Sequence, residues 1–371
     1  MAKLGEVCKV SPSTKNIERQ GAWLLNLDMV EQQTGRVIEY KYVGEDDLNG
    51  SIIQFDTENV LYSKLRPNLN KVVLPPKDGF STSELLPLRP DASVLNKDYL
   101  AAFLRSDSFV TWAVSKTAGA KMPRLGTKDL MNAEIPVPSI EQQKKIAEKF
   151  KKLEQLISLR KQQLAKLDEL VKARFVEMFL LHDYPTKTLD ELSIGKGEYG
   201  AQSASTEYDS TRPRYVRITD VNEDGTLNDD KVSSENITDD EQYRLSYGDF
   251  MFARMGATVG KTYAFLSGNQ IFAGYLIRYK LNLSLANPRY LFWYTKLDDY
   301  QKWVKLNQSG AAQPGINAKK YGSLKIPVPP IALQNQFAAF VERVDQQKQT
   351  VQRSLEKLEL MKKVLMQEYF G

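Results

Sequence analysis

The chain has 371 residues, and at roughly 150 residues per domain this length predicts two or three domains. With 42% hydrophobic and 26% charged residues the composition is that of a folded globular protein, which excludes a disordered or fibrous chain. The single cysteine, Cys8, and the single histidine, His182, exclude a disulfide framework, a Cys/His zinc site and any Ser-His-Asp relay that does not use His182 itself. The formal net charge of +5 is compatible with binding to a polyanion but too small to demonstrate it.

Secretion and membrane insertion have no signal in the sequence. Residues Met1 to Val10 lack an apolar signal core, and no run of about 18 apolar residues occurs. We therefore expect a cytoplasmic protein that has no membrane partner.

The first part of the chain combines β-rich runs with a helical pattern. The runs predicted as strands are 60–66 (VLYSKLR), 71–75 (KVVLP) and 84–89 (ELLPLR). Residues 96–116 place apolar side chains at helical spacing, so we expect Trp112 to pack in the core. The loop that follows, 117–126 (TAGAKMPRLG), must bend sharply at its Gly and Pro residues.

A long helix is predicted from Ser139 onward. Ser139 and Gln142 form a capping-box pattern, and Pro138 disfavours helix upstream. Apolar residues then alternate in steps of four and three, which is the spacing of a coiled-coil seam interrupted by Arg160 and Arg174. Near 40 residues, at about 1.5 Å each, give a rod of about 60 Å that needs a partner helix. Pairing within the chain is favoured, and homodimerisation is the alternative.

The second half of the chain repeats the first. The segment IPVPSIEQQ at Ile135 recurs as IPVPPIALQ at Ile326, and the offset of 191 residues holds without a gap from Asn96 and Asn287 onward. Earlier in each half VLYSKLRPNLNK (60–71) faces FMFARMGATVGK (250–261) at an offset of 190. The chain is therefore two tandem copies, about 1–183 and 184–371.

Copy two has the same predicted elements. Its strands are 249–254, 261–266 and 273–280, its helical pattern is 287–305 with Trp303 in the core, and its loop is 308–317 (QSGAAQPGIN). The second long helix is interrupted by Lys348 and Lys362. The predicted domains are 1–138 and 183–329, of mixed α+β type, followed by helices 139–182 and 330–371.

The two equivalent loops carry different side chains, as readers of different ligands would. Copy one has Lys121 and Arg124, whereas copy two has Gln313 and Asn317. Arg reads guanine through a bidentate bond, and Gln and Asn read adenine. The alternative is that each loop is only a turn.

A second pair of segments supplies groups suited to phosphates and base edges. These groups are Lys64, Arg66, Asn68 and Lys71 in copy one and Arg254, Thr258 and Lys261 in copy two. The alternative is that they form a solvated face of a sheet.

Two other features are decoys. GATVGKT (256–262) has three residues between its glycines, whereas a phosphate-binding P-loop requires four, so an NTPase is disfavoured. His182 lies at the junction of the copies, where a structural or solvated role is favoured over catalysis.

The order of variable domain, IPVP segment and long helix, repeated twice, resembles the DNA specificity subunits of Type I restriction-modification systems. The resemblance rests on VLYSKLRPNLNK, DFMFARMGATVGK, SGAAQPGIN, the IPVP pairs and YVRITDV (215–221), which adds Arg217 to the candidates. It implies target recognition domains that read a bipartite, asymmetric DNA sequence, and an antiparallel coiled coil of the two helices that fixes the unread gap. It also implies two adenine methyltransferase partners, with restriction subunits able to join.

The methyl-transfer motifs of such systems are absent from this sequence. An Asn-Pro-Pro-aromatic stretch and a glycine-rich cofactor site are both missing, so we expect a non-enzymatic chain without a cofactor, with S-adenosylmethionine on the partner methyltransferase. The chain is short for the family and starts almost directly in the first recognition domain. The alternatives are the recognition subunit of a related Type II-like system and a coiled-coil scaffold that binds only proteins.

Overall fold

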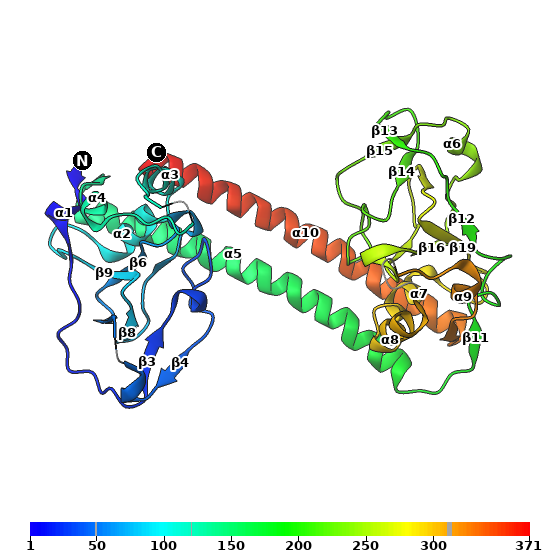
Figure 1. Cartoon of the computed structure of the whole chain (residues 1–371), viewed down its shortest axis with the longest axis horizontal. Helices are drawn as coiled ribbons and strands as arrows, with labels where there is room; N and C mark the ends of the chain where they lie inside the picture. The colour runs from blue at the N-terminus through cyan, green and yellow to red at the C-terminus, as the bar shows by residue number, and fades with distance from the viewer. Residues whose placement is uncertain (49, 120, 310–313) are drawn as a thin grey trace. The chain divides into compact units, whose positions relative to one another are not determined.

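The computed structural model describes residues 1–48, 50–119, 121–309 and 314–371 (Figure 1). The chain divides into two compact units. Unit 1 contains residues 1–163 and 351–371, and unit 2 contains residues 164–350. The predicted domain boundaries at 138, 182 and 329 follow the repeat rather than this division, and they stay predictions.

Unit 1 has two four-stranded sheets and three short helices after them. The strands are β1 (Ala2–Lys3), β2 (Cys8–Val10), β3 (Ala22–Leu25), β4 (Lys41–Val43), β5 (Ile52–Phe55), β6 (Val60–Ser63), β7 (Val72–Val73), β8 (Gly79–Thr82), β9 (Leu85–Pro90) and β10 (Glu134–Ile135). The α-helices are α1 (Leu4–Val7), α2 (Lys97–Leu104), α3 (Asp107–Ser115) and α4 (Thr127–Met131), with 3-10 turns η1 (Leu27–Met29), η2 (Glu45–Leu48) and η3 (Pro67–Leu69). The sheet orders are β2-β9-β6-β7 and β4-β3-β8-β5.

The sheet that contains β6 and β9 is covered on both faces. Val60 and Tyr62 of β6 pack into the core under the helices, whereas Leu61 packs with Trp23 and Phe55 of the other sheet. Successive residues of a strand point to opposite faces, so a strand buried on both sides reads as the continuous apolar run predicted here. In Figure 1 this sheet lies between α2 and the sheet of β3, β4 and β8.

Unit 2 repeats this plan with smaller outer sheets. Its strands are β11 (Thr186–Thr188), β12 (Glu198–Tyr199), β13 (Ser205–Glu207), β14 (Arg214–Val216), β15 (Val232–Ser234), β16 (Asp249–Ala253), β17 (Thr262–Ala264), β18 (Gln270–Phe272), β19 (Leu276–Lys280) and β20 (Lys325–Pro327). Its helices are α6 (Asp239–Gln242), α7 (Pro288–Tyr294), α8 (Asp298–Asn307) and α9 (Ala318–Gly322), with the 3-10 turn η5 (Gly256–Thr258) and the π-helical turn η4 (Val176–Leu180). The order β12-β19-β16-β17 matches β2-β9-β6-β7 of unit 1, strand for strand.

The single helical stretch expected over 96–116 is two helices. The first helix, α2, ends at Leu104, and Ser106 begins α3 because its hydroxyl accepts a hydrogen bond from Phe109 N at 3.3 Å. An N-cap side chain satisfies a free N–H and sets a new helix start, which helical spacing alone does not reveal. The expectation of one helix over 287–305 is corrected in the same way, since α7 ends at Tyr294 and α8 begins at Asp298. Trp112 and Trp303 are half-buried against apolar and aromatic neighbours, as expected.

The two long helices are α5 (Ile140–Phe175) and α10 (Ile331–Phe370), and each contributes to both units. Half of the predicted capping box is present, since Gln142 N donates to Ser139 Oγ at 3.4 Å. In unit 1 Lys362 of α10 reaches Glu154 of α5 at 3.0 Å. In unit 2 Lys348 reaches Asp168 at 2.7 Å. Lys348 and Lys362, which interrupt the predicted seam of the second long helix, thus pair with carboxylates of α5.

A buried glutamine fixes the start of each long helix. Gln143 Oε1 accepts from Asn96 N at 2.8 Å, and its Nε2 donates to Val94 O and Pro138 O. Gln334, at an offset of 191, repeats these bonds with Asn287 N, Leu285 O and Pro329 O. Both side chains are fully buried. The repeat found in the sequence therefore extends to single hydrogen bonds, and the fold is two tandem mixed α/β domains, each followed by a long helix.

The last turn of each long helix packs on the domain of the other copy. Phe370 of α10 lies against Tyr99, Phe103 and Phe150 in unit 1. Phe179, its equivalent after α5, lies against Tyr290 in unit 2. Within the described part of the chain, no helix is both long and apolar enough to cross a membrane.

Candidate nucleic-acid interface

The loop after α3 is clamped at its base in unit 1. Ala118 and Arg124 exchange both backbone hydrogen bonds, at 3.1 and 3.0 Å, and close the loop between them. Arg66 N donates to Pro123 O at 2.8 Å, and Leu125 N donates to Lys64 O at 2.9 Å. The loop is therefore seated on the chain that leaves β6.

The loop after α8 in unit 2 has the same clamp. Ser309 and Gly315 exchange both backbone hydrogen bonds at 2.9 Å. Gly256 N donates to Pro314 O, and Ile316 N donates to Arg254 O, both at 2.9 Å. Arg254 thus takes the place of Lys64, and Gly256 takes the place of Arg66. Gln313, a predicted adenine reader, lies outside the described residues.

The turn beneath each loop requires a left-handed backbone. Arg66 has a φ of 50°, whereas Gly256, its equivalent, has a φ of 72°. Glycine enters this region freely, but a residue with a side chain is strained there by roughly 1–3 kcal/mol. Unit 1 therefore keeps an exposed arginine at a position whose backbone favours glycine.

Basic side chains gather around the loop of unit 1. Lys64, Lys116 and Arg124 line an open hollow of about 570 Å³, together with Asp129. Arg124 Nε donates to Glu84 Oε1 at 3.1 Å, which fixes the guanidinium while leaving its side chain 45% exposed. Lys121 is exposed nearby, and its carbonyl accepts from Arg66 Nη2 at 3.5 Å. Four of the predicted residues are thus brought to one surface.

The other two predicted residues of unit 1 have different surroundings. Lys71 points inward, since its ammonium donates to Leu27 O and burial lowers its pKa. Asn68 is exposed, and its backbone carbonyl accepts from Gln33 Nε2 at 3.0 Å. Lys71 therefore supports the sheet edge, and its predicted contact with DNA stays a prediction.

In unit 2 only some of the predicted polar groups are free to reach a ligand. Thr258 Oγ1 donates to Met255 O at 3.3 Å, inside η5. Asn317 is exposed, but its side chain caps α9 by accepting from Lys320 N at 2.9 Å. Lys261 Nζ is shared between Val221 O and Glu223, at 3.1 and 2.9 Å.

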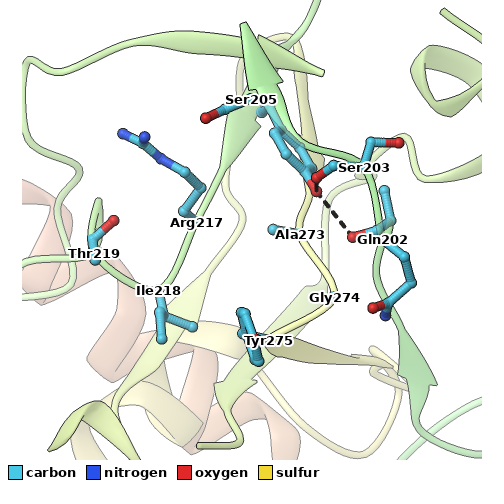
Figure 2. A pocket seen from close by; sticks show the side chains of 11 residues that line it. Gln202, Ser203, Ser205, Arg217, Ile218, Thr219, Ala273, Gly274 and Tyr275 are labelled. Atoms are coloured by element: carbon cyan, nitrogen blue, oxygen red, sulfur yellow. Dashed lines mark hydrogen bonds between the residues drawn. The ribbon is translucent and has the colours of Figure 1, made fainter. Parts of the chain in front are cut away.

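Arg217 lines a pocket of about 420 Å³ on the outer sheet of unit 2. Figure 2 shows Arg217 and Thr219 on one side of this pocket and Gln202 and Ser203 on the other. The guanidinium is matched by two carboxylates, Asp220 at 2.7 Å and Asp230 at 2.8 Å. The hydrogen bond to Asp220 is the main cause of the raised pKa of Arg217.

The loop after α3 and the loop after α8, each with the chain that leaves β6 or β16, form what we call the loop surfaces of units 1 and 2. The two loop surfaces have equivalent backbone hydrogen bonds and different side chains. Unit 1 presents Lys64, Arg66, Lys121 and Arg124, whereas unit 2 presents Arg254 beside a loop rich in small and amide side chains. Sequence reasoning missed Glu84, which orients Arg124, and Tyr199 and Tyr275, which contact Arg254. Glu84 and Tyr275 are equivalent, because Lys64 N donates to Glu84 O at 3.1 Å and Arg254 N donates to Tyr275 O at 3.0 Å. The offset of 191, continued upstream of Asn96 and Asn287, could have paired them.

The family model for the Type I restriction modification DNA specificity domain matches residues 1–169 and again residues 182–360. The chain belongs to this family. All twelve candidate DNA-binding residues fall inside the matched ranges, so each specificity domain contains one loop surface. The resemblance inferred from the sequence is confirmed, and the chain is a specificity subunit of the kind that recognises DNA sequence.

Two named specificity subunits are similar to this chain. The EcoDI subunit of Escherichia coli is 27% identical over 124 residues, which cover 33% of this chain and 27% of that protein. The MjaVIII subunit of Methanocaldococcus jannaschii is 21% identical over 313 residues, which cover 78% of this chain and 73% of that protein. A crystal structure of the S subunit of a Type I restriction-modification system from M. genitalium has the same fold, with a TM-score of 0.64, 15% identity, and coverage of 100% of this chain and 95% of that one.

Proposed function

We propose that this chain is a non-catalytic, cytoplasmic subunit that recognises a bipartite, asymmetric sequence in double-stranded DNA. Two methyltransferase subunits dock on it and methylate adenine, using S-adenosylmethionine that they bind themselves. Where restriction subunits are present, the same recognition directs cleavage. The observation that carries the proposal is the pair of loop surfaces, which are equivalent in the four backbone hydrogen bonds described above and different in side chains.

Equivalent frames with different side chains favour two unlike half-sites. Phosphate contacts position a protein on DNA, whereas side chains at base edges carry the sequence information. Arg124 of unit 1 is equivalent to Gly315 of unit 2, so one domain has a guanidinium at a position where the other has no side chain. An asymmetric target follows from this difference.

The helix contacts in each unit support a spacer role for α5 and α10. Arg160 donates to Ser354 Oγ at 3.2 Å in unit 1, and Arg174 lies over the Phe340 ring at 6.0 Å in unit 2. These contacts, with the pairs Lys362–Glu154 and Lys348–Asp168, fit an antiparallel coiled coil that sets the unread gap between the half-sites.

The test maps adenine methylation across the genome of cells with and without this gene. We expect a single motif with two specified parts and an unspecified gap, present only with the gene. Arg124→Ala is expected to relax one part while the other part stays specified. Methylation that does not depend on the gene would support the scaffold alternative and overturn the proposal.

A further inference from the structure

Arg254 differs from the neighbouring cations of unit 2 in having no carboxylate partner among the described residues. Arg217 is matched by Asp220 and Asp230, and Lys261 is matched by Glu223. Arg254 instead lies against two tyrosine rings, with its Cζ 4.9 Å from the centre of Tyr199 and 5.7 Å from that of Tyr275. Its positive charge is therefore oriented without being neutralised.

Both tyrosines are exposed, and both are tied to neighbouring backbone, Tyr199 through its hydroxyl and Tyr275 through its main-chain carbonyl. Their side chains are 41% and 52% exposed for Tyr199 and Tyr275, respectively, although large aromatic groups are usually buried. Tyr199 OH accepts from Ala318 N at 3.2 Å, and Arg254 N donates to Tyr275 O at 3.0 Å. The three residues lie at neighbouring strand ends, because β19 pairs with both β12 and β16.

The backbone at Arg254 is also hydrogen-bonded to the loop after α8. Ile316 N donates to Arg254 O, and Gly256 N donates to Pro314 O, so the loop and the arginine are held as one piece. Arg254 Nε donates to Gly274 O at 2.9 Å. This bond fixes the side chain, and the two terminal amino groups have no hydrogen-bond acceptor in the part of the chain that the structure describes.

A fixed guanidinium with two unused, coplanar donors suits one base. Guanine presents N7 and O6 side by side in the major groove, and arginine binds both at once. A phosphate would accept the same donors, but it needs no fixed plane and carries no sequence information. The rings add rigidity at little entropic cost and leave the donors free, which favours reading over simple charge attraction.

Among its described residues, unit 1 has no counterpart of this arrangement. At the place of Tyr275 it has Glu84, which holds Arg124, and at the place of Arg254 it has Lys64. We propose that Arg254 reads a guanine in the half-site of unit 2, and that Tyr199 and Tyr275 are positioning residues that determine this specificity. The proposal rests on the proposed function above.

The experiment reads the methylation motif in cells that carry the chain and its methyltransferase partners. The variants are Arg254→Ala, Tyr275→Ala and Tyr199→Ala, with Tyr275→Phe as the control that keeps the ring. We expect a guanine in the half-site of unit 2, whose preference over other bases falls roughly 5- to 150-fold in Arg254→Ala. The tyrosine-to-alanine variants should relax the same position, Tyr275→Phe should preserve it, and the other half-site should stay specified.

A change on the DNA side avoids any folding defect in the variants. Purified complex is titrated with target duplexes in which each guanine of that half-site is replaced, one at a time, by 7-deazaguanine. One replacement should weaken binding by the unmodified complex and cause no further loss in the Arg254→Ala complex.

Three results overturn the inference. A half-site without guanine does so, as does an even loss of methylation across all sequences, which marks a phosphate contact. Unchanged specificity in both tyrosine-to-alanine variants removes their positioning role. With each of these three results the chain still confers a bipartite methylation motif, so the proposed function stands while the inference fails. If the unmodified chain confers no methylation, the proposed function fails, and the inference fails with it.

Discussion

The backbone conformation at Arg66 favours glycine, yet the chain has an exposed, charged arginine there. Its left-handed backbone is the conformation that Gly256 adopts at the same place in unit 2. Strained residues of this kind cluster at functional sites, where the strained side chain is kept for its role. The arginine is exposed beside Lys121, in the loop surface.

Replacing Arg66 with glycine should separate these two effects. Arg66→Gly is expected to raise the free energy of unfolding by up to about 1 kcal/mol, because the strain is removed. DNA binding should weaken, and the slope of log affinity against log salt should fall by about 1 if a phosphate contact is lost. Urea unfolding and binding titrations measure both. Arg66→Lys, which keeps both charge and strain, should change neither property greatly, and a loss of stability in Arg66→Gly would contradict the argument.

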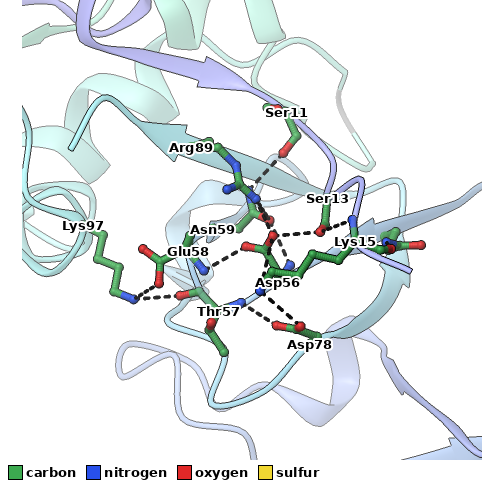
Figure 3. Close-up of polar contacts among 11 residues, drawn as sticks. Ser11, Ser13, Lys15, Asp56, Thr57, Glu58, Asn59, Asp78, Arg89 and Lys97 are labelled. Atoms are coloured by element: carbon green, nitrogen blue, oxygen red, sulfur yellow. Dashed lines mark hydrogen bonds and ion pairs between the residues drawn. The ribbon is translucent and has the colours of Figure 1, made fainter. Parts of the chain in front are cut away.

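Asp56 is the centre of a buried polar cluster in unit 1 (Figure 3). Its carboxylate accepts from Arg89 Nη2 at 2.6 Å and from Ser13 Oγ at 2.7 Å. Burial alone would raise the pKa of Asp56, but the hydrogen bonds from Arg89 and Ser13 outweigh it and hold the pKa below its usual 3.8.

This pKa predicts how stability depends on pH. Because the folded pKa lies below the unfolded one, the carboxylate stabilises unit 1 fully above about pH 5. The contribution is lost as the pH falls through the folded pKa. Asp56→Asn should therefore lower the unfolding free energy at pH 7 and leave a smaller difference at pH 3, measured by denaturant unfolding. An equal difference at both pH values would show that the charge does not matter.

At the scale of elements, the buried glutamines connect each long helix to its domain. Gln143 satisfies Asn96 N, Val94 O and Pro138 O, none of which belongs to a regular strand or helix interior. Leaving a buried backbone group unpaired costs about 1–3 kcal/mol.

Gln143→Leu should therefore destabilise unit 1 by at least about 2 kcal/mol. Gln142→Leu is the matched control, since Gln142 is the exposed neighbour on the same helix turn and should cost little. Thermal or urea unfolding measures the difference. Similar effects of the two substitutions would contradict the assigned role.

The length of α5 and α10 should set the gap between the half-sites. Seven residues inserted after Gln163 and seven after Thr350 keep the heptad and lengthen the pair by about 10 Å, or about three base pairs. We expect a methylation motif with a correspondingly longer gap and unchanged specified bases. A seven-residue insertion in the exposed turn at Gly195 is the control, and it should leave the gap as it was.

The sequence predicted the elements better than it predicted the sites. Strands such as 249–254 and both long helices appear where expected, because a duplicated pattern gives two independent readings of each element. The break at Ser106 was missed because a serine cap is compatible with helical spacing. Two of the predicted cations have partners that are distant in the sequence: Lys71 donates to Leu27 O, and Lys261 binds Val221 O and the Glu223 carboxylate. Residue type alone does not reveal such contacts.

At the scale of the whole molecule, each unit is completed by a helix end from the other copy. Phe370 is 6% exposed in the core of unit 1, and Phe179 is 3% exposed in unit 2. Truncating a buried phenylalanine to alanine costs about 3–5 kcal/mol.

The two phenylalanines form a matched pair of tests. Phe370→Ala should reduce protection from hydrogen exchange in α2 and α3 of unit 1, where its ring and carbonyl make contacts. Phe179→Ala should reduce protection in α7 of unit 2 instead. Hydrogen-exchange mass spectrometry resolves the two regions. Loss of protection in the same unit for both substitutions would contradict the exchange of helix ends.

The order of synthesis gives this exchange a further consequence. Unit 2 is one continuous stretch, so all of it is synthesised before residues 351–371 are added. Tyr99 and Phe103 of unit 1 must meanwhile wait for Phe370 through more than 200 further residues, or roughly 10–50 s of translation. The domain made first is therefore completed last. During that interval the apolar surface around Tyr99 and Phe103 is accessible to chaperones, to proteases and to the equivalent helix end of another nascent chain.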